Sequence, residues 1–154
     1  MEKIASFTVN HDVLMPGLYL SRRDGNVTTF DLRFKRPNTG DLLTNTQMHS
    51  VEHIIATALR NSPQKDAVIY FGPMGCQTGF YFLFDSVRLS DAQAIDLLRQ
   101  VFAQGAVWSD PMPGKSSREC GTYRNLDTAL ARDCCAFYAN VIRNWDVGQL
   151  VYPE

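Results

Sequence analysis

The sequence lacks long apolar runs and an excess of charge of one sign. No stretch approaches the ~20 consecutive apolar residues of a membrane-spanning helix. The formal net charge of the 154 residues is −1, which gives no basic surface for nucleic acid or for an anionic membrane. The first residues, "MEKIASFTVN", lack the basic and apolar regions of a secretory signal. We therefore expect a cytoplasmic protein that binds neither nucleic acid nor membranes.

Internal repeats, low-complexity segments and linkers are also lacking, so residues 1–154 predict a single domain. With 45% hydrophobic residues, the chain can form a substantial core. Strand pairs joined by short turns favour an antiparallel β-sheet, and helices between the pairs are expected to pack over it, as in an α+β fold. The expected hairpins span residues 17–35, with a turn at 24–26, and residues 67–87; the expected helices span residues 44–61, 90–104 and 126–145.

Histidine is scarce and unevenly distributed, because two of the three histidines lie in the segment "HSVEH". If this segment is helical, His49 and His53 stack one turn apart with Glu52 beside them. Two imidazole nitrogens at this spacing can bind one divalent metal ion, and a carboxylate next to them can transfer protons. The pattern H-x-x-E-H is the inverted form of a metallopeptidase signature. A solvated polar helix face without a metal would have the same spacing.

The four cysteines fall into two groups. Cys134 and Cys135 lie in an expected helix rich in alanine and aromatic residues, where at least one is expected to fill the core. Cys76 and Cys120 each stand beside glycine in irregular segments, where a thiol can reach a cleft. We interpret Cys120 as the third metal ligand, which leaves a fourth position open for water or substrate. Cys76 is then a free thiol near a cation, which favours the reactive thiolate.

Five motifs occur in an order that resembles one enzyme family. They are "SFTVNHD" (residues 6–12), "FDLRFKRPN" (30–38), "HSVEH" (49–53), "GPMGCQTGFY" (72–81) and "ECGTY" (119–123). The set resembles S-ribosylhomocysteine lyase, the LuxS family. The resemblance implies a metal-dependent homodimer with an α+β fold. It also implies cleavage of the thioether of S-ribosylhomocysteine to homocysteine and 4,5-dihydroxy-2,3-pentanedione, the precursor of autoinducer-2.

The resemblance further implies roles for individual residues. Carried over by motif, the metal ligands are His49, His53 and Cys120, the catalytic residues are Cys76 and Glu52, and the substrate-binding residues are Ser6, His11 and Arg33. In the implied homodimer, these substrate-binding residues of one chain complete the pocket that holds the metal, Glu52 and Cys76 of the other. One divalent metal ion is expected per chain, with Fe²⁺ first and Zn²⁺ or Co²⁺ as alternatives, because imidazole and thiolate suit all three.

Two positions depart from the family pattern. Tyr70 stands where the family commonly has an acidic residue that holds the amine of homocysteine, and Lys35 stands where a cysteine is frequent. The segment between the first motif and the first hairpin is also shorter than is usual for the family. We therefore expect weaker binding of the homocysteine end of the substrate, and a related enzyme that acts on a modified substrate is an alternative.

The implied reaction fits the chemistry of these residues. Migration of a carbonyl along the open sugar, followed by β-elimination of a thiolate, needs a Lewis acid and bases on both faces of the substrate. The metal supplies the Lewis acid, and Cys76 and Glu52 supply the bases. Two other functions use the same motif. One is a metallopeptidase in which Glu52 activates water, and the other is a non-catalytic zinc-stabilised binding module that Cys76 closes as a fourth ligand.

Overall fold

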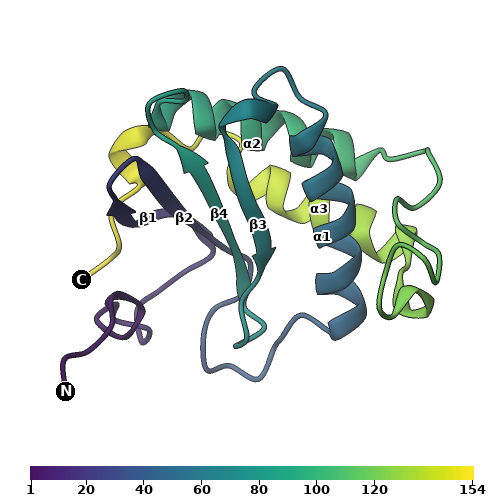
Figure 1. The fold of residues 1–154 in the computed structure, drawn as a ribbon. Helices are drawn as coiled ribbons and strands as arrows, with labels where there is room; N and C mark the ends of the chain where they lie inside the picture. Colours follow the sequence, from purple (N-terminus) through teal and green to yellow (C-terminus); the bar gives the residue numbers. More distant parts are fainter.

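The computed structural model describes residues 1–154 and contains one four-stranded antiparallel sheet with three α-helices (Figure 1). The strands are β1 (Gly17–Asp24), β2 (Val27–Arg33), β3 (Val68–Pro73) and β4 (Gly79–Asp85). The helices are α1 (Asn45–Arg60), α2 (Asp91–Ala106) and α3 (Thr128–Val141). Short 3₁₀ helices are η1 (Ala5–Phe7), η2 (Lys65–Ala67), η3 (Tyr123–Asn125) and η4 (Val147–Gln149). The expected α+β fold is confirmed, and none of its helices has the length and hydropathy needed to cross a membrane.

Both predicted hairpins form, and they join through the central strands β2 and β4, giving the order β1-β2-β4-β3. The first hairpin turns at Gly25, whose φ of 58° is a conformation that glycine adopts without strain. The second hairpin joins β3 to β4 through residues 74–78. Because Arg33 at the end of β2 pairs with Gly79 at the start of β4, the tip of the second hairpin lies beside the end of β2.

The three helices cover one face of the sheet and bury its apolar side chains (Figure 1). Phe30, Leu32 and Phe82 are fully buried on this face, since successive strand residues point to opposite sides. The other face of β2 carries Asp31 and Arg33, which are nevertheless only 1% and 3% exposed. Residues from both ends of the chain cover this second face.

Helix α1 begins and orients as its sequence predicts. The Thr44 side chain accepts a hydrogen bond from the backbone of Gln47, whose side chain accepts one from the backbone of Thr44 in return. This capping box fixes the first turn. The apolar side of α1 packs against β3, α2 and α3. Its polar side carries His49, Glu52 and His53, all half-buried, and its edge with Glu52 and His53 borders a cavity next to β3.

Helix α3 is shorter than the predicted span of residues 126–145. It starts after Asp127, whose side chain accepts a hydrogen bond from a backbone N–H of the first turn. Beyond Val141, the Arg99 side chain from α2 donates to the carbonyl oxygen of Ile142. The same carbonyl oxygen accepts from the backbone N–H of Trp145, three residues on, so the helix ends in a tighter turn that Arg99 also contacts.

The two cysteines of α3 are core residues, as predicted. Cys134 is 8% exposed and Cys135 is fully buried. Burial raises the pKa of Cys135 to about 12, and it also raises the pKa of Cys134 above its ordinary value. Both thiols therefore stay protonated and behave as small apolar side chains.

Candidate functional site

Three side chains with metal-binding atoms converge beside α1, and we call them the metal group: His49, His53 and Cys120. Their donor atoms all lie within 4.8 Å of one another. The Cys120 sulfur lies 3.3 Å from Nε2 of His49 and 3.8 Å from Nε2 of His53. Ligand atoms at ~2.0–2.3 Å from one tetrahedral ion are separated by about 3.5 Å. The metal group therefore fits a single ion held by two imidazoles and a thiolate.

The outer nitrogen of each imidazole is engaged, which turns the inner nitrogen toward the metal position. His53 Nδ1 donates to the carbonyl oxygen of Pro113 at 2.8 Å, and His49 Nδ1 donates to the side-chain oxygen of Asn125 at 2.5 Å. The proton of each neutral ring therefore sits on Nδ1, and Nε2 keeps its lone pair for a metal. Neither Pro113 nor Asn125 was predicted, because Pro113 lies in a loop and Asn125 in the short helix η3, and no spacing rule describes how these segments approach α1.

The loop that carries Cys120 is fastened to α1. The backbone N–H of Asp127 donates at 2.8 Å to the hydroxyl of Ser50, a fully buried residue of α1. Gly114 packs its backbone against the ring of His53, with a φ of 70°. A Cβ atom on this glycine would lie 2.9 Å from Nδ1 of His53. The position of the loop thus depends on a close approach that a side chain would prevent.

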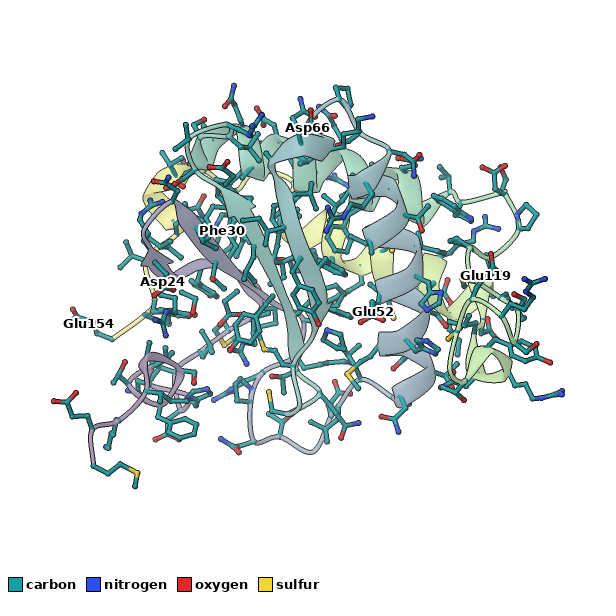
Figure 2. The ribbon with its side chains drawn as sticks, viewed as in Figure 1. Asp24, Phe30, Glu52, Asp66, Glu119 and Glu154 are labelled. Atoms are coloured by element: carbon teal, nitrogen blue, oxygen red, sulfur yellow. The ribbon has the colours of Figure 1, made fainter.

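Glu52 borders a cavity of about 350 Å³ next to the metal group. The carboxylate lies on the side of α1 that faces β3 (Figure 2). It lines this cavity together with His53, while Tyr70 and Phe71 of β3 form the opposite wall. Glu52 and His53 of the metal group therefore open onto the same space.

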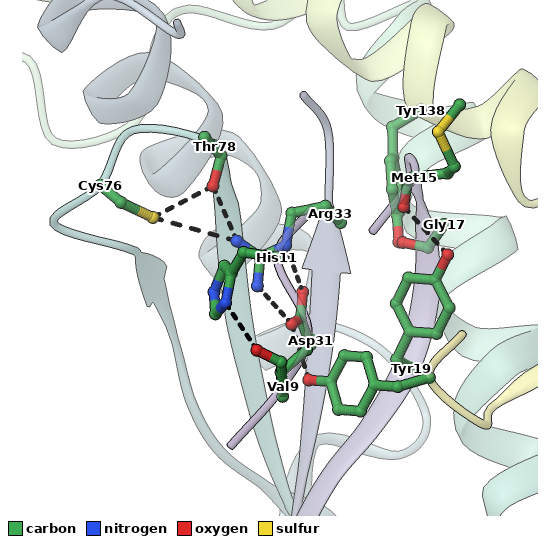
Figure 3. Close-up of polar contacts among 11 residues, drawn as sticks. Val9, His11, Met15, Gly17, Tyr19, Asp31, Arg33, Cys76, Thr78 and Tyr138 are labelled. Atoms are coloured by element: carbon green, nitrogen blue, oxygen red, sulfur yellow. Dashed lines mark hydrogen bonds and ion pairs between the residues drawn. The ribbon is translucent and has the colours of Figure 1, made fainter. Parts of the chain in front are cut away.

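Cys76 lies at the exposed tip of the β3–β4 hairpin, away from the metal group. Its sulfur lies 3.0 Å from the hydroxyl oxygen of Thr78 and 3.9 Å from Nη1 of Arg33 (Figure 3). The sulfur therefore lies beside the cationic group of Arg33. Because the metal group consists of three side chains and does not include Cys76, the single chain does not form the closed four-ligand site of a zinc-stabilised module.

Arg33 is held in place by a buried carboxylate. Its Nε and Nη2 donate to the two oxygens of Asp31 at 3.1 and 2.6 Å, and its Nη1 donates to Thr78 at 2.7 Å (Figure 3). Burial alone would lower the pKa of Arg33, but the charge and hydrogen bonds of Asp31 outweigh it and raise that pKa. Asp31 was not among the predicted site residues. Its signal in the sequence is its position two residues before Arg33 in a strand, which puts both on one face.

Four predicted site residues line one cavity of about 220 Å³, which we call the thiol cavity: Ser6, His11, Arg33 and Cys76. The N-terminal segment contributes His11, whose Nδ1 donates at 2.9 Å to a backbone carbonyl of the same segment. The thiol cavity is distinct from the cavity that Glu52 lines. This grouping differs from the expected division, which placed Cys76 with the metal and Glu52 of one chain. The reason is that the hairpin tip lies beside the end of β2, whereas Glu52 lies beside the β3 edge.

The fold and these groups define an α+β domain that has a His-His-Cys group suited to a metal ion and a separate thiol-bearing cavity. The sequence profile of the family S-Ribosylhomocysteinase (LuxS) matches residues 4–147. The chain therefore belongs to the LuxS family, and the predicted resemblance is confirmed.

Full-length relatives carry the corresponding name. A protein of Finegoldia magna is 42% identical over 158 residues, which cover 100% of both chains. A protein of Desulfotalea psychrophila is 44% identical over 163 residues, again covering 100% of both chains. A third, from Borrelia garinii subsp. bavariensis, is 41% identical over 159 residues, covering 99% of this chain and 100% of the relative. Each of the three is named S-ribosylhomocysteine lyase.

Proposed function

We propose that this protein is an S-ribosylhomocysteine lyase that forms homocysteine and 4,5-dihydroxy-2,3-pentanedione, the precursor of the signal autoinducer-2. Membership of the LuxS family and the names of its full-length relatives support this substrate. The metal group is the observation that carries the proposal. Three protein ligands leave one coordination position for a substrate oxygen, as in catalytic metal sites. A metallopeptidase is less favoured, since it has no use for a thiol cavity.

The proposed cofactor is one divalent ion per chain, bound to the metal group. Fe²⁺ is the proposed resident ion, and Zn²⁺ and Co²⁺ suit the same two imidazoles and thiolate. When bound, the ion supplies a Lewis acid that polarises vicinal oxygens of the open sugar. The proposed location is the cytoplasm, where the four unpaired cysteines would remain reduced.

Cys76 and Glu52 supply the proton transfers of the proposed reaction. Moving the carbonyl from C1 to C3 of the open sugar takes two enolisations, in each of which a proton leaves one carbon and another reaches its neighbour. The Cys76 thiolate takes and returns the carbon-bound protons, and the Glu52 carboxylate exchanges protons with the sugar oxygens. A proton then leaves C4, the C4–C5 double bond forms and the C5–S bond breaks. The resulting enol loses its O–H proton and takes a proton at C5, which gives the dione of the product. Homocysteine departs as a thiolate, and no external oxidant is needed.

These proton transfers require both cavities at one substrate, and we propose that a homodimer provides them. In this arrangement the thiol cavity of one protomer faces the metal group and Glu52 of its partner. Apolar side chains near the cavities support such a contact, because Ile4, Phe7 and Tyr70 are 57%, 69% and 52% exposed. A two-fold interface is self-complementary, so one contact creates two equivalent active sites.

We also propose that the amino-acid end of the substrate is held differently from the common family pattern. Tyr70, where an acidic residue is common, lines the cavity of Glu52 and a neighbouring cavity that reaches Ser6. Its phenol lies over Gly72, where a Cβ atom would clash with it. The ring thus occupies space beside the proposed reaction site without offering a negative charge to an ammonium group.

Release of homocysteine tests the proposed function. Metal-loaded protein is mixed with S-ribosylhomocysteine, and free thiol is followed with a chromogenic disulfide. A matched control is a ribosyl thioether whose C1 carries a nucleobase, because that sugar cannot open to an aldehyde. We expect thiol from the first compound and none from the second. Peptide cleavage without thiol release would overturn the proposal in favour of a metallopeptidase.

A further inference from the structure

The C-terminal residues lie along β1 and reach the second face of the sheet. The backbone N–H of Leu20 donates to the carbonyl oxygen of Leu150 at 2.7 Å, and the register of β1 shifts just beyond it. Tyr152 stacks on Tyr19 of β1, with ring centroids 5.0 Å apart and an angle of 19° between the rings. A main-chain hydrogen bond and a stacked ring pair thus dock the tail. They place Tyr152 in the wall of the thiol cavity.

The Tyr152 hydroxyl contacts the carboxylate of Asp31, which also holds Arg33. It donates to Oδ2 of Asp31 at 2.7 Å, the same oxygen that accepts from Nη2 of Arg33. Asp31 is only 1% exposed, so its lone pairs depend on protein donors. Burial raises the pKa of Tyr152, and the negative charge of Asp31 raises it further. The phenol therefore keeps its proton and acts as a donor to Asp31.

The same carboxylate aims Arg33 at the hairpin tip. Two nitrogens of the guanidinium are tied to Asp31, which fixes the plane of the group. The remaining nitrogen, Nη1, then points to Thr78 and to the sulfur of Cys76 (Figure 3). A continuous line of contacts therefore runs from the C-terminal tail through Asp31 and Arg33 to the thiol.

We propose that Tyr152 is a positioning residue that acts through Asp31 and Arg33 to favour the thiolate of Cys76. If the Tyr152 hydroxyl is removed, Arg33 is the only side-chain donor left to Asp31, and the carboxylate carries more uncompensated charge. The guanidinium is then drawn away from Cys76, and the negative field near the sulfur grows. Both changes disfavour the thiolate. The inference rests on the proposed function only in that Cys76 is the reactive thiol.

Alkylation of Cys76 tests this role without requiring turnover. Metal-loaded protein is treated with iodoacetamide at neutral pH, and modification of each cysteine is followed by peptide mass spectrometry. Tyr152→Phe removes the hydroxyl and keeps the ring, and we expect about a three- to tenfold slower alkylation of Cys76. Tyr19→Phe is the matched control. It removes a neighbouring hydroxyl that donates to the backbone of Met15 at 2.9 Å, and it should leave the rate unchanged.

Two further variants separate positioning from loss of structure. A chain that ends at Val151 should match Tyr152→Phe. Arg33→Lys keeps a positive charge but loses the pair of guanidinium nitrogens that donate to Asp31. In this background, Tyr152→Phe should have no additional effect. An unchanged rate in Tyr152→Phe, an equal loss in Tyr19→Phe, or a full additional loss in the Arg33→Lys background would each overturn the proposal. Because alkylation and homocysteine release are measured separately, failure of the lyase reaction is recognised independently.

Discussion

The carbonyl oxygen of Pro113 accepts a hydrogen bond from Nδ1 of His53 at 2.8 Å, and this contact joins the loop of Cys120 to α1. It fixes the tautomer of His53, so that Nε2 faces the Cys120 sulfur. The next residue, Gly114, lies so close to the ring that the contact depends on its missing side chain. The geometry of the metal group is therefore set by a backbone path as much as by its ligands.

Gly114→Ala should weaken metal binding. The added methyl group would meet the His53 ring, and the φ of 70° disfavours alanine. Loss of ligand orientation of this kind lowers metal affinity by about 10- to 100-fold. Competition with a chromogenic chelator measures the affinity. Gly121→Ala is the control, since open space surrounds that position next to Cys120, and its affinity should be unchanged. Equal affinities in the two variants would contradict the role of the close approach.

Substitution of a metal ligand should remove the ion. His49→Ala, His53→Ala and Cys120→Ala should each reduce the metal content from about one ion per chain to a small fraction of it, because two ligands bind weakly. Cys134→Ala keeps the metal group intact and should retain the ion. Metal analysis of anaerobically purified protein gives the content. Full occupancy in Cys120→Ala would show that this thiolate is not a ligand.

Loss of a base should leave the metal in place. Cys76→Ala and Glu52→Gln should fold and bind the ion normally, because neither residue belongs to the metal group. Turnover should fall by about 10²- to 10⁴-fold, the usual contribution of a positioned acid or base. Parallel metal analysis and homocysteine release separate the two effects. Near-normal turnover in either variant would remove that residue from the proposed proton transfers.

An acidic residue at the position of Tyr70 should improve substrate binding. Tyr70→Asp adds a charge that can pair with the ammonium of the homocysteine end, and we expect KM to fall about tenfold with little change in kcat. Tyr70→Asn has nearly the same shape without the charge and serves as the control. If both variants lower KM equally, relief of crowding by the ring explains the change, and the amine is held elsewhere.

The core of the metal site could be predicted from sequence because local rules determine it. The spacing of His49, Glu52 and His53 needs only a helix of ordinary periodicity, and the capping residue Thr44 predicts where that helix begins. The contacts of Pro113 and Asn125 depend on how a loop and the short helix η3 fold back onto α1. No periodic pattern marks such contacts, so they could be seen only in the structure.

The division of the site into two cavities could not be predicted from the sequence either. Motif order assigned roles to Cys76 and Arg33 but did not indicate that the hairpin tip meets the end of β2. The length of α3 was overestimated for a related reason. The main chain after Val141 forms a tighter turn, in which the carbonyl oxygen of Ile142 accepts from Trp145 and also from Arg99 of α2. Each difference involves a contact between segments far apart in the chain.

Complementation between inactive variants measures most directly whether two half-sites combine to cleave S-ribosylhomocysteine. Cys76→Ala damages the thiol cavity, and Glu52→Gln damages the opposite half. After reversible dissociation and equal mixing, half of the dimers should be mixed, and each should hold one intact site. Homocysteine release should therefore recover to about a quarter of the wild-type rate. His11→Ala mixed with Cys76→Ala should stay inactive, because both lesions lie in the thiol cavity. With subunit exchange verified by mass spectrometry, an inactive first mixture, or an active second one, would contradict the proposed shared site.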